Sequence, residues 1–142
     1  MPILRRVATD VEFDLCWPLL ALAFGPPDDA KRRTWREMYL CSKDLCLYGA
    51  QEEGEALGVV GVWREGATVC EITHISIAPK YRRLGRGRAL FAELRRLHPA
   101  VRFWIAETDD DAVGFYVALG FAVEDLGEIY PSVRRYLCTL AA

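Results

Sequence analysis

Closely spaced metal-ligating residues are missing from this sequence. It holds five cysteines without a single C-x-x-C pair, and its only two histidines, His74 and His98, lie far apart along the chain. Structural metal sites are usually built from closely spaced Cys and His residues, so we expect no metal site. The cysteines are then best explained as small core residues in a reducing compartment.

Long apolar runs and a large net charge are missing as well. No segment is apolar enough to span a bilayer, and the N-terminus lacks the charged-then-apolar pattern of a signal peptide. We therefore expect a cytoplasmic protein with no membrane partner. The formal net charge is -2 at pH 7, which gives the chain as a whole no attraction for nucleic acid.

The composition that remains is typical of one globular domain. The 142 residues are 52% hydrophobic and 27% charged, which supports a real core and argues against disorder. The sequence shows no internal repeat, low-complexity segment or linker. We therefore expect a single domain over residues 1–142.

A strand, a glycine-bearing loop and a helix are predicted in succession between residues 69 and 98. The β-branched residues Ile72, Ile75 and Ile77 favour a strand, and Pro79 ends it because proline has no N–H to pair. Apolar residues then recur at helical spacing, which predicts a helix from about residue 86. Its apolar face is formed by Leu90, Phe91, Leu94 and Leu97.

The loop before this helix has the properties of a phosphate site. Gly85 and Gly87 permit a tight turn and leave no side chain over the backbone amides. A helix N-terminus presents free N–H groups and the positive end of its dipole, which suit an anion. Basic residues crowd the same place: Lys80, Arg82, Arg83, Arg86 and Arg88. We interpret the loop as a cradle for a pyrophosphate; the alternative is an ordinary turn with a solvated basic face.

Two common phosphate motifs do not fit the loop. A Walker A loop needs Lys-Ser or Lys-Thr after its glycines, and a Rossmann fingerprint needs a third glycine where Leu90 stands. The remaining pattern, Arg82-x-x-Gly85-x-Gly87, resembles the Q/R-x-x-G-x-G/A motif of the GNAT superfamily of acyl-CoA-dependent N-acetyltransferases.

A second motif carries the same resemblance. The segment from Asp109 to Phe121 is similar to the family signature N-x-x-A-x-x-F-Y-x-x-x-G-F. It matches at Ala112, Phe115, Tyr116, Gly120 and Phe121. It departs at Asp109, where the family usually has Asn, and an ionised Asp cannot donate the hydrogen bond that an Asn amide can.

The resemblance implies an α/β (α+β) fold, in which helices flank a mixed, mostly antiparallel central sheet whose central strands splay apart. The predicted order agrees with it: strand, two helices, three strands, helix, strand, helix and two strands. Strands are predicted at 2–7, 45–50, 56–63, 69–77, 102–107, 121–125 and 134–140. Helices are predicted at 10–24 with Asp10 as its N-cap, from 28 or 29 onward, at 86–98 and between 109 and 120, with a break at Gly25–Pro27. The strand at 102–107 is apolar enough to be buried on both faces, as in a parallel pair with 69–77.

Acetyl-CoA is the co-substrate that the resemblance implies. The loop amides would bind its pyrophosphate, the strand backbone would pair with its pantetheine arm, and an N–H near Ile77 would polarise the thioester carbonyl. The implied cofactor-binding residues are Ile75, Ser76, Ile77, Arg82, Arg83, Leu84, Gly85, Arg86, Gly87, Arg88, Asp109 and Tyr116.

The resemblance also implies catalytic positions. Glu71 is the first candidate for the general base, Glu107 the second and His74 a third; for each, an ordinary structural role remains open. Tyr116 is the candidate acid that protonates the departing thiolate, since a phenol keeps its proton at neutral pH. Its alternative role is that of a core aromatic.

The acceptor side is less well defined. The family resemblance makes Phe24, Trp35 and Tyr39 candidate pocket residues, with core packing as the alternative, and predicts that the loop 127–132 lies over the acceptor. His98 should complement the dipole at its helix end. The expected function is transfer of an acetyl group to a primary amine of a small molecule or protein, by a monomer or homodimer. The alternatives are a non-catalytic acyl-CoA-binding sensor and a nucleic-acid-binding module.

Overall fold

One seven-stranded sheet runs through the computed structural model, which describes residues 2–24 and 28–142. The strand order is β1-β2-β3-β4-β5-β7-β6. The strands are β1 (Arg5–Arg6), β2 (Leu45–Glu52), β3 (Glu55–Glu65), β4 (Val69–Ile77), β5 (Phe103–Asp109), β6 (Ala122–Tyr130) and β7 (Val133–Ala141). The helices are α1 (Asp10–Leu20), α2 (Asp29–Cys41), α3 (Arg86–Leu97) and α4 (Val113–Ala118), with 3₁₀ turns at Ala21–Ala23 and Pro79–Tyr81. The break predicted at 25–27 lies outside the described residues.

The element order and the fold class are confirmed, and the strand at 69–77 has the predicted bounds. Thr9, and not Asp10, caps α1: its backbone is extended, and its Oγ1 accepts from the N–H of Glu12 at 3.1 Å. Pro18 lies inside α1, which continues as α-helix to Leu20 before the 3₁₀ turn.

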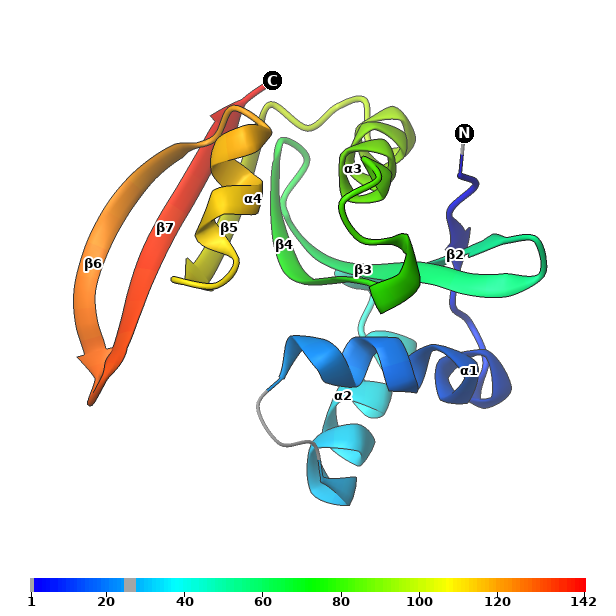
Figure 1. Cartoon of the computed structure of the whole chain (residues 1–142). Helices are drawn as coiled ribbons and strands as arrows, with labels where there is room; N and C mark the ends of the chain where they lie inside the picture. Colours follow the sequence, from blue (N-terminus) through cyan, green and yellow to red (C-terminus); the bar gives the residue numbers. More distant parts are fainter. Residues whose placement is uncertain (1, 25–27) are drawn as a thin grey trace.

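The sheet opens at its centre. β2, β3 and β4 form an antiparallel meander, and α3 then leads to β5, which is parallel to β4. The parallel pairing comprises three residue pairs and stops at Glu71–Ile105. Figure 1 shows β4 and β5 diverging beyond this point. The predicted splay of the central strands is thus present.

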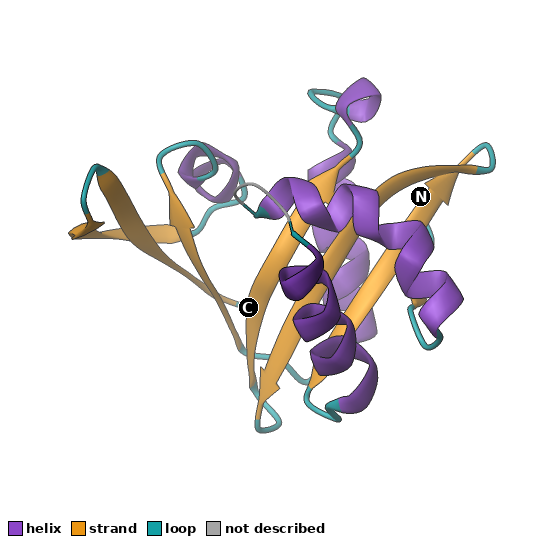
Figure 2. Ribbon diagram, turned by 90° about the horizontal axis from the view of Figure 1, so that it is seen from below, coloured by secondary structure: helices purple, strands orange, loops and turns teal. Residues whose placement is uncertain are grey.

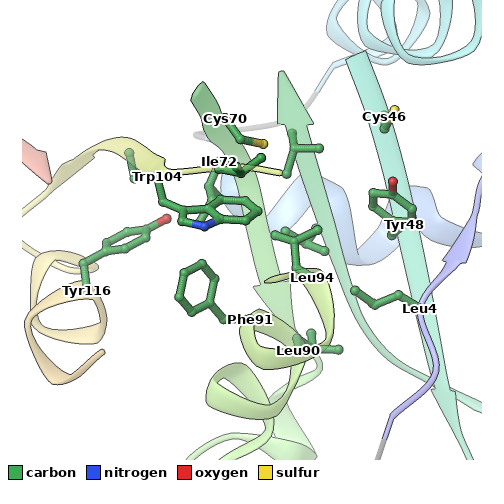
Figure 3. Packing of buried hydrophobic residues seen from close by; sticks show 14 of the residues in the cluster. Leu4, Cys46, Tyr48, Cys70, Ile72, Leu90, Phe91, Leu94, Trp104 and Tyr116 are labelled. Atoms are coloured by element: carbon green, nitrogen blue, oxygen red, sulfur yellow. The ribbon is translucent and has the colours of Figure 1, made fainter. Parts of the chain in front are cut away.

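The core has two parts, one on each face of the sheet. α1 and α2 cover β2, β3 and β4 on one face, where Phe13, Leu20 and Tyr39 are buried; Figure 2 shows these helices crossing the strands. On the other face α3 and α4 bury Leu90, Phe91, Leu94, Trp104 and Tyr116, as Figure 3 shows. The buried apolar surface of both faces fixes the helices around the opening.

Two expectations about the C-terminal half are wrong. β5 is not buried on both faces: Trp104 is covered, but Phe103 is 51% exposed because α1 and α2 pack on β2, β3 and β4 instead. The expected loop at 127–132 is mostly strand. β6 runs to Tyr130, where β7 satisfies its backbone, so the segment forms the end of a long hairpin that projects past α4 (Figure 1).

Candidate functional site

The loop between β4 and α3 leaves six consecutive backbone N–H groups, those of residues 83–88, without an acceptor among the described residues. The N–H of Arg82 bonds to Pro79 O, and that of Ala89 bonds to Gly85 O. Between them Arg83 and Gly85 have left-handed backbones, with φ of 63° and 76°. Successive free amides in such a bend, followed by a helix N-terminus, form a concave site for an anion.

A cavity of about 450 Å³ extends from this loop along the end of β4. Nine of the predicted cofactor residues line it: Ile75, Ser76, Ile77, Arg82, Arg83, Gly85, Arg86, Gly87 and Arg88. Three do not. These are Leu84, which is 57% exposed, Asp109, and Tyr116, which is buried.

Phe115 belongs to the cavity, although it is not among the predicted cofactor-binding residues. It lines the wall opposite the loop, together with Ala112 and Leu119 of the α4 region. A side chain on Gly87 would bring its Cβ within 2.6 Å of Phe115 Cε1. The second glycine of the first motif therefore packs against the first aromatic of the second motif. The only sequence signal for Phe115 was its place in the second motif, beside Tyr116.

Most of the basic side chains near the loop are already engaged. Lys80 pairs with Glu55, and Arg86 Nη2 lies 2.9 Å from Glu52 Oε1. Arg82 Nε donates to Ile77 O at 3.0 Å, and Arg88 Nη2 donates to Ala118 O at 2.7 Å. Among the described residues Arg83 has no such partner. Four of the five cations thus hold the loop against β2–β3, β4 and α4, and Arg83 is the one left for a ligand.

The edge of β4 that faces β5 is open beyond Glu71. Over Ile75–Ile77 the strand pairs with β3 on one side only, at Gly58, Val59 and Val60. An extended chain can add to such an edge as one more strand. The open edge ends beside the free loop amides, so a single ligand can reach both.

Glu71 lies at the last residue pair before the strands part. Its side chain is half-buried, and burial, followed by the charges of Glu107 and Glu65, raises its pKa above the ordinary value. Glu107 is exposed, and Arg135 Nε lies 3.4 Å from its Oε1. No hydrogen bond or ion pair engages the Glu71 carboxylate within the described chain. Of the two carboxylates, Glu71 is the freer to accept a proton.

Tyr116 is 4% exposed, and its ring packs against Phe115 and Phe121 with centroids 5.2 and 5.3 Å away. Figure 3 shows its hydroxyl directed toward Trp104 on β5, one residue before the last parallel pair. Its hydroxyl has no hydrogen-bond partner among the described residues. Burial raises the pKa of the phenol, so the group is protonated at neutral pH.

Asp109 has a local role. Its Oδ1 accepts from the N–H of Asp111 at 3.0 Å and from that of Ala112 at 3.2 Å. The carboxylate therefore supports the turn that leads into α4. An acceptor suffices for this contact, which explains how Asp fits where the resembled signature has Asn.

The predicted acceptor residues Phe24, Trp35 and Tyr39 come together around His74. The Phe24 and Trp35 ring centroids lie 4.7 and 4.5 Å from that of His74, and Tyr39 Oη lies 2.5 Å from His74 Nδ1. Burial lowers the pKa of His74 to about 4, so the imidazole is neutral at physiological pH. It does not accept a proton readily, which weighs against His74 as the base.

His98 is structural, but it does not carry the expected charge. Arg64 Nη1 lies 2.8 Å from its Nδ1, and Tyr48 Oη lies 2.9 Å from its Nε2. Burial, then the charges of Arg64 and Arg6, lower its pKa. An arginine can only donate, so Nδ1 is an acceptor and the ring is neutral.

Within residues 2–24 and 28–142, no helix is both long and apolar enough to cross a membrane. That part of the chain also contains no group of three or more His, Cys, Asp or Glu side chains arranged to hold a metal ion.

Comparison with known proteins identifies the family to which this chain belongs. The sequence model of the acetyltransferase (GNAT) family matches residues 12–121, and the chain therefore belongs to this family. It is 31% identical over 100 residues to the peptidyl-lysine N-acetyltransferase YiaC of Escherichia coli (strain K12). That alignment covers 67% of this chain and 66% of YiaC, about two thirds of each.

Solved structures share the fold. A GNAT-family protein from Desulfovibrio desulfuricans superposes with a TM-score of 0.82 at 22% identity, over 99% of both chains. A GNAT acetyltransferase from Elizabethkingia anophelis with acetyl-CoA bound gives a TM-score of 0.70 at 20% identity, over 100% of this chain and 97% of that one.

Replacing Arg83 should weaken acetyl-CoA binding. Arg83→Ala removes a cation that has no partner in the described chain, so we expect the Kd to rise about tenfold, with a weaker dependence on salt than in the wild type. Isothermal titration calorimetry at two salt concentrations measures both. Arg33→Ala, which removes an exposed arginine on α2, is the control and should bind as the wild type does. An unchanged Kd in Arg83→Ala would exclude Arg83 from the site.

Proposed function

We propose that this GNAT-family acetyltransferase moves an acetyl group from acetyl-CoA to a primary amine, and that a lysine side chain of a protein is the first acceptor to test. One observation carries the proposal: six free amides and an open strand edge meet in a single cavity. The likeness to a peptidyl-lysine N-acetyltransferase supports the choice of acceptor. A small-molecule amine is the other acceptor class.

The residues of the cavity suit the parts of acetyl-CoA. The amides of residues 83–88 and the Arg83 guanidinium would bind its diphosphate. The backbone of Ile75–Ile77 would pair with its pantetheine arm, and an N–H near Ile77 would donate to the thioester carbonyl. Acetyl-CoA, when bound, supplies the acyl group as an activated thioester.

Glu71 would prepare the amine. A lysine ammonium has a pKa of about 10.4, so it must lose a proton before its nitrogen can attack. A carboxylate with a raised pKa is a better proton acceptor than an ordinary one. Glu71 also belongs to the last β4–β5 residue pair, where the opening that would admit the donor begins. Glu107, held by Arg135, is the second candidate.

Tyr116 would supply the proton that the leaving thiolate needs. Its raised pKa keeps the phenol protonated, and its hydroxyl has no competing acceptor among the described residues. Tyr116 belongs to the same short helix, α4, as Phe115, which lines the cavity, so a small shift of the phenol would bring its hydroxyl to the thiolate.

We further propose that residues 1–142 form one N-acetyltransferase domain that works in the cytoplasm. All five cysteines are free thiols, and Cys46, Cys70 and Cys138 are buried. Free buried thiols are usual in a reducing compartment.

A turnover assay tests the function. The protein is mixed with acetyl-CoA and, in separate reactions, a lysine peptide, a free alkyl diamine or no amine, and thiol release is followed with mass analysis of the acceptor. We expect release above the no-amine rate together with an acetylated amine, fastest for the peptide. Tight acetyl-CoA binding without release for any amine would instead indicate an acyl-CoA-binding sensor.

Glu71→Gln should reduce kcat/KM by about 100-fold, because the amide cannot accept the ammonium proton. The pKa of Glu71 is raised, and the base must be ionised, so the wild-type rate should rise with pH through an apparent pKa above that of an ordinary Glu. That limb should be absent from the variant's pH–rate profile. Glu37→Gln, on the exposed side of α2, is the control. A larger loss in Glu107→Gln than in Glu71→Gln would assign the base to Glu107.

Tyr116→Phe should slow turnover more than it weakens binding. The ring still packs against Phe121, so we expect kcat to fall by about 10- to 100-fold while the Kd for acetyl-CoA changes by less than about threefold. Stopped assays and calorimetry on the same preparation provide both numbers. Tyr130→Phe, at an exposed position of the hairpin, controls for loss of a hydroxyl. Equal kcat in the wild type and Tyr116→Phe would remove the acid role.

A further inference from the structure

A chain of three hydrogen-bonding side chains joins α2 to the centre of β4. The hydroxyl of Tyr39 lies 2.6 Å from Thr73 Oγ1 and 2.5 Å from His74 Nδ1. Tyr39 itself is 1% exposed. The network thus runs from a buried hydroxyl on α2 to two partly buried side chains on β4.

Thr73 is the extra residue of a β-bulge. In the β3–β4 pairing Gly61 faces His74 and Val62 faces Ile72, so Thr73 has no residue opposite it. A bulge bends its strand and increases the local twist. This one lies just after Glu71, where β4 leaves β5, and just before the open edge at Ile75–Ile77.

Gly61 is what allows the hydroxyl to reach the bulge. A Cβ at residue 61 would lie well inside contact distance of Tyr39 Oη and 2.9 Å from Thr73 Oγ1. The hydroxyl thus occupies the space that any other residue at position 61 would fill. Because Thr73 and His74 are partly buried, removing the hydroxyl would leave each of them without this hydrogen bond in a place that water reaches only in part.

The network lies between the candidate acceptor residues and the proposed base. The His74 ring lies against Phe24 and Trp35, on the acceptor side. Glu71, the proposed base, lies two residues before Thr73 on the same strand; burial raises the pKa of Tyr39, and the charge of Glu71 adds to that shift.

We propose that Tyr39 is a positioning residue, whose hydroxyl holds the bulge at Thr73 and so sets the direction of the open Ile75–Ile77 edge relative to Glu71. The inference rests on the proposed acetyl transfer. Tyr39 acts through the backbone of β4 and not by contact with the reacting atoms. Displacing that backbone would misalign the acyl group and the base, and small misplacements of this kind are costly in rate.

Tyr39→Phe and Tyr48→Phe form a matched pair for the test. Tyr48 is also buried and also bonds a histidine, His98, but on the α3 face of the sheet. Each variant keeps its ring and loses one buried hydroxyl. We expect similar losses of Tm in the two. Only Tyr39→Phe should lower kcat, by about tenfold, and only it should speed amide hydrogen exchange over residues 72–78.

Thr73→Val removes the second hydroxyl of the network at constant shape and should reproduce the faster exchange. Unchanged exchange in both Tyr39→Phe and Thr73→Val, or an equal loss of kcat in Tyr48→Phe, would overturn the positioning role. Wild-type protein that turns over no amine would contradict the proposed function, but the exchange comparison would still decide whether Tyr39 holds the bulge.

Discussion

The parallel pairing of β4 and β5 stops after three residue pairs, and the whole site depends on this stop. Backbone N–H and C=O groups in a sheet normally satisfy one another, and unpaired ones need water or a ligand. By parting after Glu71, the strands leave such groups in the middle of the sheet and not at its edge. The opening is kept rigid because each strand stays paired on its outer side, β4 with β3 and β5 with β7.

The loop at residues 82–88, between β4 and α3, is held in place for a related reason. Three arginine side chains fix the loop to its surroundings. Arg86 forms an ion pair with the β2–β3 hairpin, and Arg82 and Arg88 donate hydrogen bonds to the end of β4 and to α4. Because these contacts hold the loop, little of its conformational freedom would be lost if a ligand bound its free amides. An anion near the loop would be attracted mainly by the N-terminus of α3 and by the Arg83 guanidinium.

Local signals predicted much of this structure, and contacts between distant segments account for what they missed. The strand 69–77 and the helix after Gly85 follow from β-branched residues, glycine and apolar spacing within the segments themselves. The partner of Arg86 could not be foreseen, because Glu52 comes from a hairpin 34 residues earlier. Phe115 was missed for the same reason, and the exposure of Phe103 depends on which strands α1 and α2 cover. The predicted loop at 127–132 failed because a glycine and a proline can also end a paired hairpin.

The contact between Gly61 and Tyr39 links two positions that are 22 residues apart in the chain. A substitution at one position therefore constrains the other. A larger residue at position 61 would require a shorter side chain at position 39, and a shorter side chain at position 39 alone would leave a void under the bulge. Among relatives of this protein the two sites should change in concert. The residue pair at positions 61 and 39 would then distinguish relatives in which a tyrosine hydroxyl supports the β4 bulge from relatives in which other contacts support it.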